Sequence, residues 1–267
     1  MSRKLISVIN GLISPLGVEL RRRGAVSPFR DKLREGVEEM EKLVRATIFP
    51  DLPQKSGRQE LMMQLLGTQL SEALHLVWHL NRSLHLEGEV CEFGIAQGAT
   101  SALIANEILG TDKNLWLFDS FEGLPKPTDR DVLIDDIFNL GSIEKYQGTM
   151  AFGQEQVICR LNSIKFPLGR VKVVPGFIEK TAKYANLPKE VCFAYVDFDL
   201  YEPVRIALEL LDSRLPIGGV VIVDDYGFFS EGAQAAVDEF VEARERRYTK
   251  DPSPEWASRF CVLRRSI

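Results

Sequence analysis

From residue 89 onward the chain alternates short apolar runs with longer helical patterns, and this alternation limits the fold more than any other feature. Strands that are apolar on both faces and are joined by helices form parallel sheets covered on both sides. The sequence therefore predicts an α/β domain with an open, doubly wound, mostly parallel sheet, in which ligands bind beyond the carboxyl ends of the strands. We expect strands at 89–95, 114–120, 171–176, 191–199, 220–226 and 259–265, and helices near 99–110, 153–164, 201–213 and 232–246.

The residues before this alternating part are expected to be helical. Leucine and methionine recur at spacings of three and four through residues 57–85, which predicts one long amphipathic helix. We therefore expect a helical N-terminal region, residues 1–86, packed on a core domain of residues 87–267. In residues 1–24, basic residues flank an apolar stretch that glycine and proline interrupt, without a small-residue cleavage site. This pattern predicts an amphipathic segment that packs on the domain or on a partner subunit, with transient membrane contact as the alternative.

Charge and composition exclude several classes of partner. The formal net charge is −5, whereas nonspecific binding of nucleic acid needs a basic surface. No run of about 18 apolar residues is present, so we expect no stable insertion in a membrane. The four cysteines are scattered without CxxC spacing, which suits a reducing compartment, and we expect the cytoplasm. The sequence leaves a monomer and a homodimer both open.

The first strand leads into a glycine-bearing turn, EFGIAQGATS (92–101), that opens a helix. Such a turn lets a ligand approach the backbone, and the N-terminus of the helix offers free N–H groups. The second strand ends in Asp119, where a carboxylate can accept both hydroxyls of a ribose; the alternative is that Asp119 caps the next turn. Together these features predict an adenosine-containing cofactor and leave nicotinamide and S-adenosylmethionine both open.

Four aspartates stand at the ends of two apolar runs: Asp197 and Asp199 in VDFDLYEP, and Asp224 and Asp225 in VIVDDY. If the strand stays regular, Asp197 and Asp199 share one face while Phe198 points away. Carboxylates are the hard oxygen ligands that Mg²⁺ prefers. The alternative is that Asp199 and Asp225 cap helices. Dense negative charge strains a fold without a cation, and we therefore expect a metal site.

Several of these motifs resemble those of the macrocin O-methyltransferase family. The similar stretches are EFGIAQGATS, LFDSFEGLPKP (117–127), VVPGF (173–177), DFDLYEP and VDDYG, which together span residues 90–240. Enzymes of this family use S-adenosylmethionine and a metal, and mostly methylate deoxysugar hydroxyls of antibiotics. The resemblance implies a class I methyltransferase (Rossmann-like) fold with a seven-stranded sheet. It also implies that Asp197, Asp224 and Asp225 hold Mg²⁺ and that Asp199 is the general base.

The expected cofactor site lies at the turn of residues 94–100, with Asp119 on the ribose and Phe177 at the adenine. No histidine follows residue 85, so a carboxylate is the base that remains near the four aspartates. The residues expected to bind S-adenosylmethionine are Glu92, Gly94, Gln97, Gly98, Thr100, Ser101, Asp119, Ser120, Gly176, Phe177 and Asp197.

The expected function is O-methylation of a small-molecule acceptor, a hydroxyl of a sugar or glycosylated natural product. A catechol-type acceptor is the alternative within the same chemistry. Two further alternatives are a nicotinamide-dependent oxidoreductase, for which no Tyr–Lys proton donor is visible, and a noncatalytic relative with the same fold. Residues 122–150 form a polar stretch long enough to be a lid over the acceptor. We expect its aspartates, Asp131, Asp135 and Asp136, to be solvated, with substrate contact as the alternative.

Overall fold

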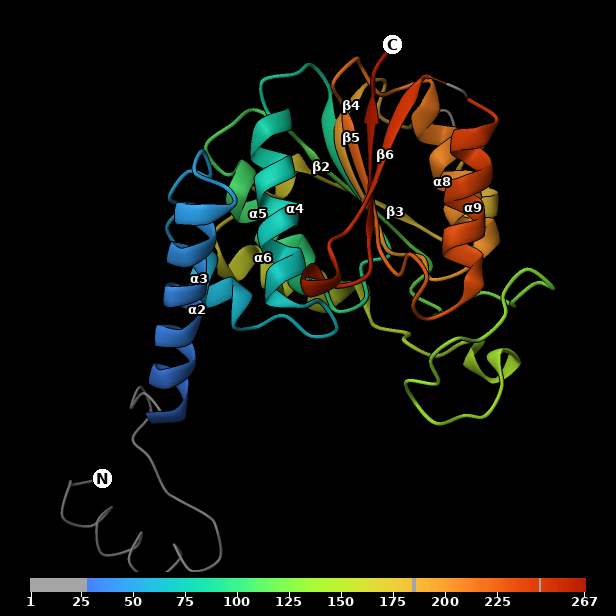
Figure 1. Ribbon diagram of the computed structural model, residues 1–267, viewed down its shortest axis with the longest axis horizontal. Coiled ribbons are helices and arrows are strands. Elements are labelled where there is room, and N and C mark those ends of the chain that lie inside the picture. The colour runs from blue at the N-terminus through green and yellow to red at the C-terminus, as the bar shows by residue number, and fades with distance from the viewer. Residues whose placement is uncertain (1–27, 184–185, 245) are drawn as a thin grey trace, which may run out of the picture.

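A seven-stranded sheet forms the centre of the protein in the computed structural model, which describes residues 28–183, 186–244 and 246–267 (Figure 1). The strand order is β3-β2-β1-β4-β5-β7-β6. Strands β1 to β5 are parallel, β7 pairs antiparallel with β5, and β6 pairs antiparallel with β7. The predicted mostly parallel α/β sheet is confirmed. The strands are β1 (Glu89–Phe93), β2 (Leu115–Asp119), β3 (Val171–Pro175), β4 (Val191–Val196), β5 (Val220–Val223), β6 (Tyr248–Pro252) and β7 (Cys261–Arg265).

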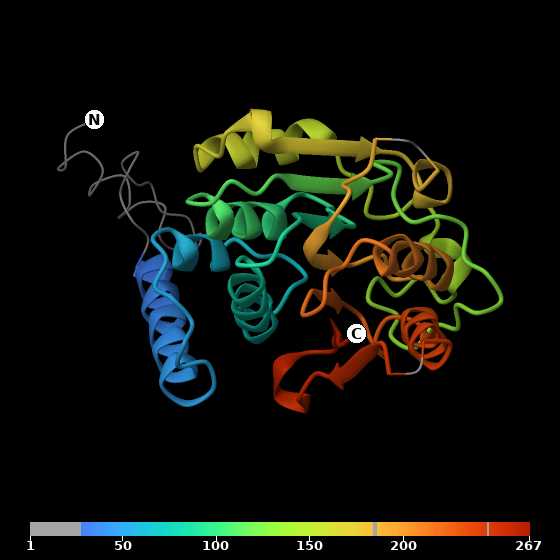
Figure 2. The ribbon, with the colours of Figure 1, turned by 90° about the horizontal axis from the view of Figure 1, so that it is seen from above.

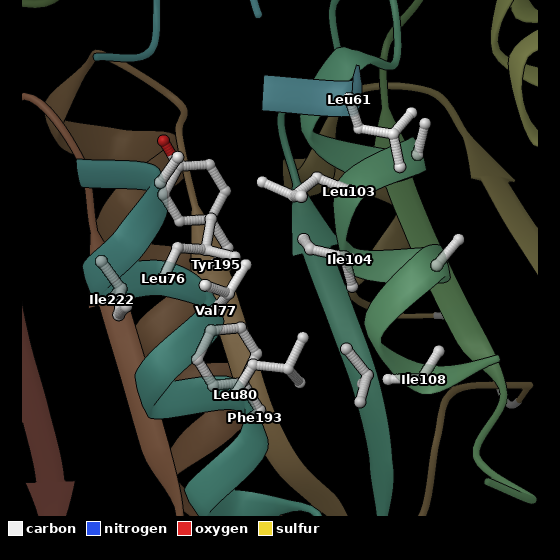
Figure 3. Close-up of a cluster of buried hydrophobic side chains, with 14 of the residues drawn as sticks. Leu61, Leu76, Val77, Leu80, Leu103, Ile104, Ile108, Phe193, Tyr195 and Ile222 are labelled. Atoms are coloured by element: carbon white, nitrogen blue, oxygen red, sulfur yellow. The ribbon is translucent and has the colours of Figure 1, made fainter. Parts of the chain in front are cut away.

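Helices cover both faces of the sheet, as Figure 2 shows from above. Alternate residues of β4 belong to different cores: Phe193 and Tyr195 pack with α4, α5 and α6, whereas Ala194 and Val196 pack with α8 and α9. Figure 3 shows the first of these cores, where α3, α4 and α5 meet Phe193 and Tyr195. The helices are α2 (Pro28–Thr47), α3 (Arg58–Met62), α4 (Leu70–Ser83), α5 (Ala99–Ile108), α6 (Gln154–Ser163), α7 (Ile178–Thr181), α8 (Tyr201–Asp212) and α9 (Glu231–Glu242).

The prediction of one long helix over residues 57–85 is wrong, because the structure has two separate helices there, α3 and α4. Gly67, between them, has φ +90°, a left-handed conformation that cannot continue a right-handed helix. Leu66 is 61% exposed although it fits the apolar spacing. The amphipathic segment expected in residues 1–24 lies outside the described residues, and the division at residue 86 stays a prediction.

A buried arginine, Arg58 of α3, connects the N-terminal helix α2 to α5. The Arg58 guanidinium donates to both carboxylate oxygens of Glu107 on α5, at 2.8 and 2.7 Å, and to Glu41 of α2 at 2.9 Å. Arg58 is fully buried and also donates to the carbonyl of Pro53, while the side-chain amides of Asn81 and Gln59 donate to Glu107 and Glu41. Among the described helices, none is long and apolar enough to cross a membrane.

The segment of residues 122–150 lies beyond the carboxyl ends of the parallel strands, beside α8 and α9 (Figure 1). It has a small core of its own, in which Leu124 and Tyr146 pack against Phe229. Asp131 is buried, not solvated as predicted, because its carboxylate accepts the backbone N–H of Tyr201 at 2.6 Å at the start of α8. This bond fixes the base of the segment to the helix that follows β4.

Candidate active site

A cavity of about 550 Å³ lies where β1, β2, β4 and β5 end. Its polar wall combines the glycine turn after β1 with Asp119 at the end of β2 and the aspartates after β4 and β5. Residues 66–68, between α3 and α4, also contribute. Apart from Ser120 and Glu179, the remaining wall is apolar and includes Leu124, Ile137, Phe138 and Met150 of the 122–150 segment. The segment predicted to be a lid therefore lines the cavity, whereas Asp131, Asp135 and Asp136 do not.

Most of the predicted site residues meet at this cavity, and the others do not line it. The lining includes Gly94, Gln97, Asp119, Ser120, Phe177, Asp197, Asp199, Asp224 and Asp225. The predicted residues that do not line it are Glu92, Gly98, Thr100, Ser101 and Gly176. The role of each predicted residue stays a prediction.

The glycine turn requires glycine for a steric reason. Gly94 has φ +79°, and a Cβ added there would lie 1.8 Å from the carbonyl oxygen of Asp197. The turn is also held by Asp119, whose Oδ2 accepts the backbone N–H groups of Ile95 and Ala96 at 2.7 and 3.2 Å. Asp119 Oδ1 accepts the N–H of Phe121 at 2.7 Å, as the capping alternative predicted. One acceptor position on Oδ1 remains for a ligand.

Glu92 lies behind the turn and supports it from β1. Its side chain is fully buried, and Oε1 accepts the Thr100 hydroxyl at 2.5 Å, which ties the first turn of α5 to the strand. Burial raises the pKa of the Glu92 carboxyl to about 7. Within the described residues its Oε2 has no hydrogen-bond partner.

The four aspartates beyond β4 and β5 all line the cavity, as expected for the carboxyl ends of neighbouring parallel strands. Strand β4 ends at Val196, so the strand alternation on which the shared face of Asp197 and Asp199 depended does not extend to them, although both line the cavity. Asp199 and Asp225 have φ of +61° and +54°. Left-handed conformations cost non-glycine residues about 1–2 kcal/mol and concentrate at functional sites.

The structure also tests the alternative that Asp199 and Asp225 cap the helices that follow them. The N-cap residue of α8 is Leu200, without a side-chain cap, and the Tyr201 N–H bonds to Asp131 and not to Asp199. The cap of α9 is Ser230, whose hydroxyl accepts the N–H of Gly232. Neither Asp199 nor Asp225 therefore serves as the helix cap that the sequence offered.

Electrostatics at the four aspartates favour a positive partner. Burial raises the pKa of each carboxyl, and repulsion from neighbouring carboxylates raises it further at Asp197, Asp199 and Asp225. No ion pair with lysine, arginine or histidine reaches them in the part of the chain that the structure describes. This all-oxygen donor set fits a hard cation. Across the described ranges, however, no three His, Cys, Asp or Glu side chains form a preassembled metal cluster.

Two residues at this site were not predicted from the sequence. The Tyr195 hydroxyl lies 2.7 Å from Asp224 Oδ2 and 2.7 Å from Glu72 Oε1. Glu72 belongs to α4 and lies 123 positions before Tyr195. No local sequence pattern predicts such a contact, since Tyr195 lies within an apolar strand and has no distinguishing neighbour in the sequence.

Comparisons with known proteins agree with this architecture. One relative is 28% identical over 81% of this chain and 87% of its own: the 8-demethyl-8-(2,3-dimethoxy-alpha-L-rhamnosyl)-tetracenomycin-C 4'-O-methyltransferase of Streptomyces olivaceus. The mycinamicin III 3''-O-methyltransferase of Micromonospora griseorubida is 29% identical over 52% of this chain and 55% of its own.

Two solved structures share the fold. The O-methyltransferase NovP superposes with a TM-score of 0.65 at 18% identity, over 87% of this chain and 99% of its own. The calicheamicin methyltransferase CalS11 superposes with a TM-score of 0.58 at 18% identity, over 90% of this chain and 94% of its own. The class I methyltransferase fold is thereby confirmed. The family model for macrocin-O-methyltransferase (TylF) matches residues 51–252, and the chain belongs to this family.

Proposed function

We propose that this protein is a divalent-cation-dependent O-methyltransferase that uses S-adenosylmethionine and acts on a sugar hydroxyl of a glycosylated natural product. The family and the fold support S-adenosylmethionine as methyl donor. The observation that carries the proposal is that one cavity joins the glycine turn after β1 to the carboxylates after β4 and β5. Cofactor, acceptor and cation can then meet in one place.

The turn side of the cavity is proposed to hold the cofactor, which supplies a sulfonium methyl group to a nucleophilic oxygen. Gly94 leaves the backbone open to close approach, and Gln97 and Ser120 offer polar groups beside it. Asp119 keeps one acceptor position for a ribose hydroxyl after binding the turn. The Phe177 ring gives the apolar surface that a purine needs.

Asp197, Asp224 and Asp225 are proposed to hold Mg²⁺. Bound there, the cation would lower the pKa of an acceptor hydroxyl. Buried carboxylates that repel one another bind a cation favourably, because the positive charge removes the strain of their repulsion. Since the side chains do not form a preassembled cluster, cation binding is expected to draw them together.

Asp199 is proposed to take the proton from the acceptor hydroxyl onto its carboxylate. It lines the same cavity as Asp197, Asp224 and Asp225, so its carboxylate lies near an acceptor hydroxyl held there. The apolar wall of Phe138, Met150 and Phe228 would keep water away from the reacting atoms. Holding the reactants in line can supply about 7–11 kcal/mol of the barrier reduction.

The relatives suggest the acceptor class. Their names describe methylation at a 4' or a 3'' oxygen of glycosylated compounds, and we extend that class to this chain. The catechol-type alternative uses the same groups and is decided by the assay below. A cytoplasmic location and the absence of nucleic-acid partners rest on sequence alone and stay predictions, and the sequence allows a homodimer as well as a monomer.

The test is transfer of labelled methyl from S-adenosylmethionine to a panel of glycosides and catechols, with Mg²⁺ and again with EDTA. We expect transfer to glycosides that stops with EDTA and in Asp197→Asn protein. The matched control is Asp251→Asn, an exposed aspartate on β6, which should keep full activity. Transfer that persists in EDTA would remove the cation from the proposal, and transfer to catechols alone would replace the acceptor class.

A further inference from the structure

Tyr195 connects α4 to the aspartates beyond β5. Its hydroxyl contacts both Asp224 Oδ2 and Glu72 Oε1 at 2.7 Å. Tyr195 is fully buried and Glu72 is 2% exposed. We infer that Tyr195 and Glu72 are positioning residues that hold the Asp224 carboxylate for cation binding, an inference that rests on the proposed function. Helix α4, outside the nucleotide-binding part of the fold, thereby becomes part of the active site.

The contacts fix Asp224 at both of its oxygens. Oδ1 accepts the backbone N–H of Asp225 at 2.8 Å, and Oδ2 faces the Tyr195 hydroxyl. A carboxylate held in this way keeps one orientation, so less freedom is lost when it binds a cation. In this network the Tyr195 hydroxyl orients the Asp224 carboxylate, and Glu72 in turn holds the Tyr195 hydroxyl.

The position of the Tyr195 hydroxyl is set by packing. Figure 3 shows the Tyr195 ring against Leu76 and Val77 of α4, inside the hydrophobic core. Tyr195 pairs with Ile222 across the β4–β5 ladder, so its side chain lies near the end of β5, where Asp224 follows. The ring is therefore anchored on one side by the sheet and on the other by α4.

Packing alone does not explain these polar groups. A phenylalanine would fill the space of Tyr195, and burying a hydroxyl and a carboxyl costs free energy that an apolar pair would avoid. No ion pair compensates Glu72 among the residues that the structure describes. The contacts run from Glu72 through Tyr195 to Asp224, which lines the cavity. A role in holding Asp224 at the site explains these buried polar groups, whereas a purely structural role does not.

The test measures Mn²⁺ binding to the full chain by electron paramagnetic resonance, and S-adenosylhomocysteine binding by calorimetry without added metal. Tyr195→Phe removes only the hydroxyl, and Glu72→Leu removes the polar partner of that hydroxyl at a similar side-chain size. Each should weaken Mn²⁺ binding by about 10–100-fold, the usual effect of losing an outer partner, and leave S-adenosylhomocysteine affinity unchanged. The matched control is Tyr248→Phe, whose buried hydroxyl lies 2.8 Å from Asp212 on the far side of the sheet; it should change neither.

Three outcomes would overturn the inference. Wild-type Mn²⁺ affinity in both variants would show that Asp224 needs no such support, and the proposed function would survive. Equal loss of Mn²⁺ and S-adenosylhomocysteine binding would indicate a merely structural role. Absence of Mn²⁺ binding in the wild type would end both this inference and the cation in the proposed function. If Tyr195→Phe does not fold, Glu72→Leu decides, since it removes the same contact from the side of α4.

Discussion

Gly94→Ala is the substitution whose effect follows most directly from the backbone. The added Cβ would lie 1.8 Å from the Asp197 carbonyl oxygen, whereas real Cβ atoms essentially never come closer than 3.0 Å. The ends of β1 and β4 would have to separate by about 1.2 Å (3.0 − 1.8). Alanine would in addition have to adopt φ +79°. Both effects act on the turn and on Asp197, which line the cavity.

The expected magnitude is the sum of two costs. A left-handed conformation costs alanine about 1–2 kcal/mol, and overpacking costs about 1–3 kcal/mol. The free energy of unfolding should fall by about 2–5 kcal/mol, which lowers the midpoint of thermal unfolding by about 5–15 °C. The displaced turn should also weaken S-adenosylhomocysteine binding strongly.

The assay combines thermal unfolding with calorimetric titration of S-adenosylhomocysteine. The control is Gly110→Ala, because a Cβ there meets nothing within 4 Å and the backbone is not left-handed. Gly110→Ala should unfold and bind as the wild type does. If Gly94→Ala matches that control in both measurements, the close approach of β1 to β4 is not what shapes the cofactor site.

Three further perturbations have effects that the structure determines. Asp199→Asn should lower kcat by about 10²–10⁴-fold, as loss of a general base does, with S-adenosylhomocysteine affinity retained in titration. Arg58→Met should lower the free energy of unfolding in urea by about 3–5 kcal/mol, because it leaves Glu107 and Glu41 without their buried partner. Burial raises the pKa of Glu92 from 4.5 to about 7, so the folded state retains a proton that the unfolded state releases. Its contribution to stability is full below about pH 4.5 and is lost as pH rises through about 7; Glu92→Gln should remove about 3 kcal/mol of this pH dependence in urea titrations.

The fold was largely predictable because its strands are apolar on both faces. The strand that escaped prediction is β6, whose sequence YTKDP has Tyr248 as its only buried residue. An edge strand with one buried side chain has no period for a sequence pattern to detect. The other error, the single helix at 57–85, arose because apolar spacing continues through the loop around Gly67.

The candidate site was predictable where it depends on strand ends and not where it depends on tertiary contacts. Parallel strands bring their carboxyl ends to one edge, so Asp119, Asp197 and Asp224 could be placed together from the sequence. The contact between Glu72 and Tyr195 could not, because it depends on how α4 packs on β4. The left-handed backbone at Asp199 likewise follows from the path of the chain after β4 and has no sequence signature.

The most direct measurement is a crystal structure of the full chain grown with S-adenosylhomocysteine and Mn²⁺, with manganese located by anomalous scattering. We predict S-adenosylhomocysteine in the cavity against the turn at Gly94, and one manganese peak bound by Asp197, Asp224 and Asp225. A cofactor bound elsewhere would contradict the assignment of the cavity. Manganese at another place, or at none, with the cofactor in this cavity would contradict the cation site.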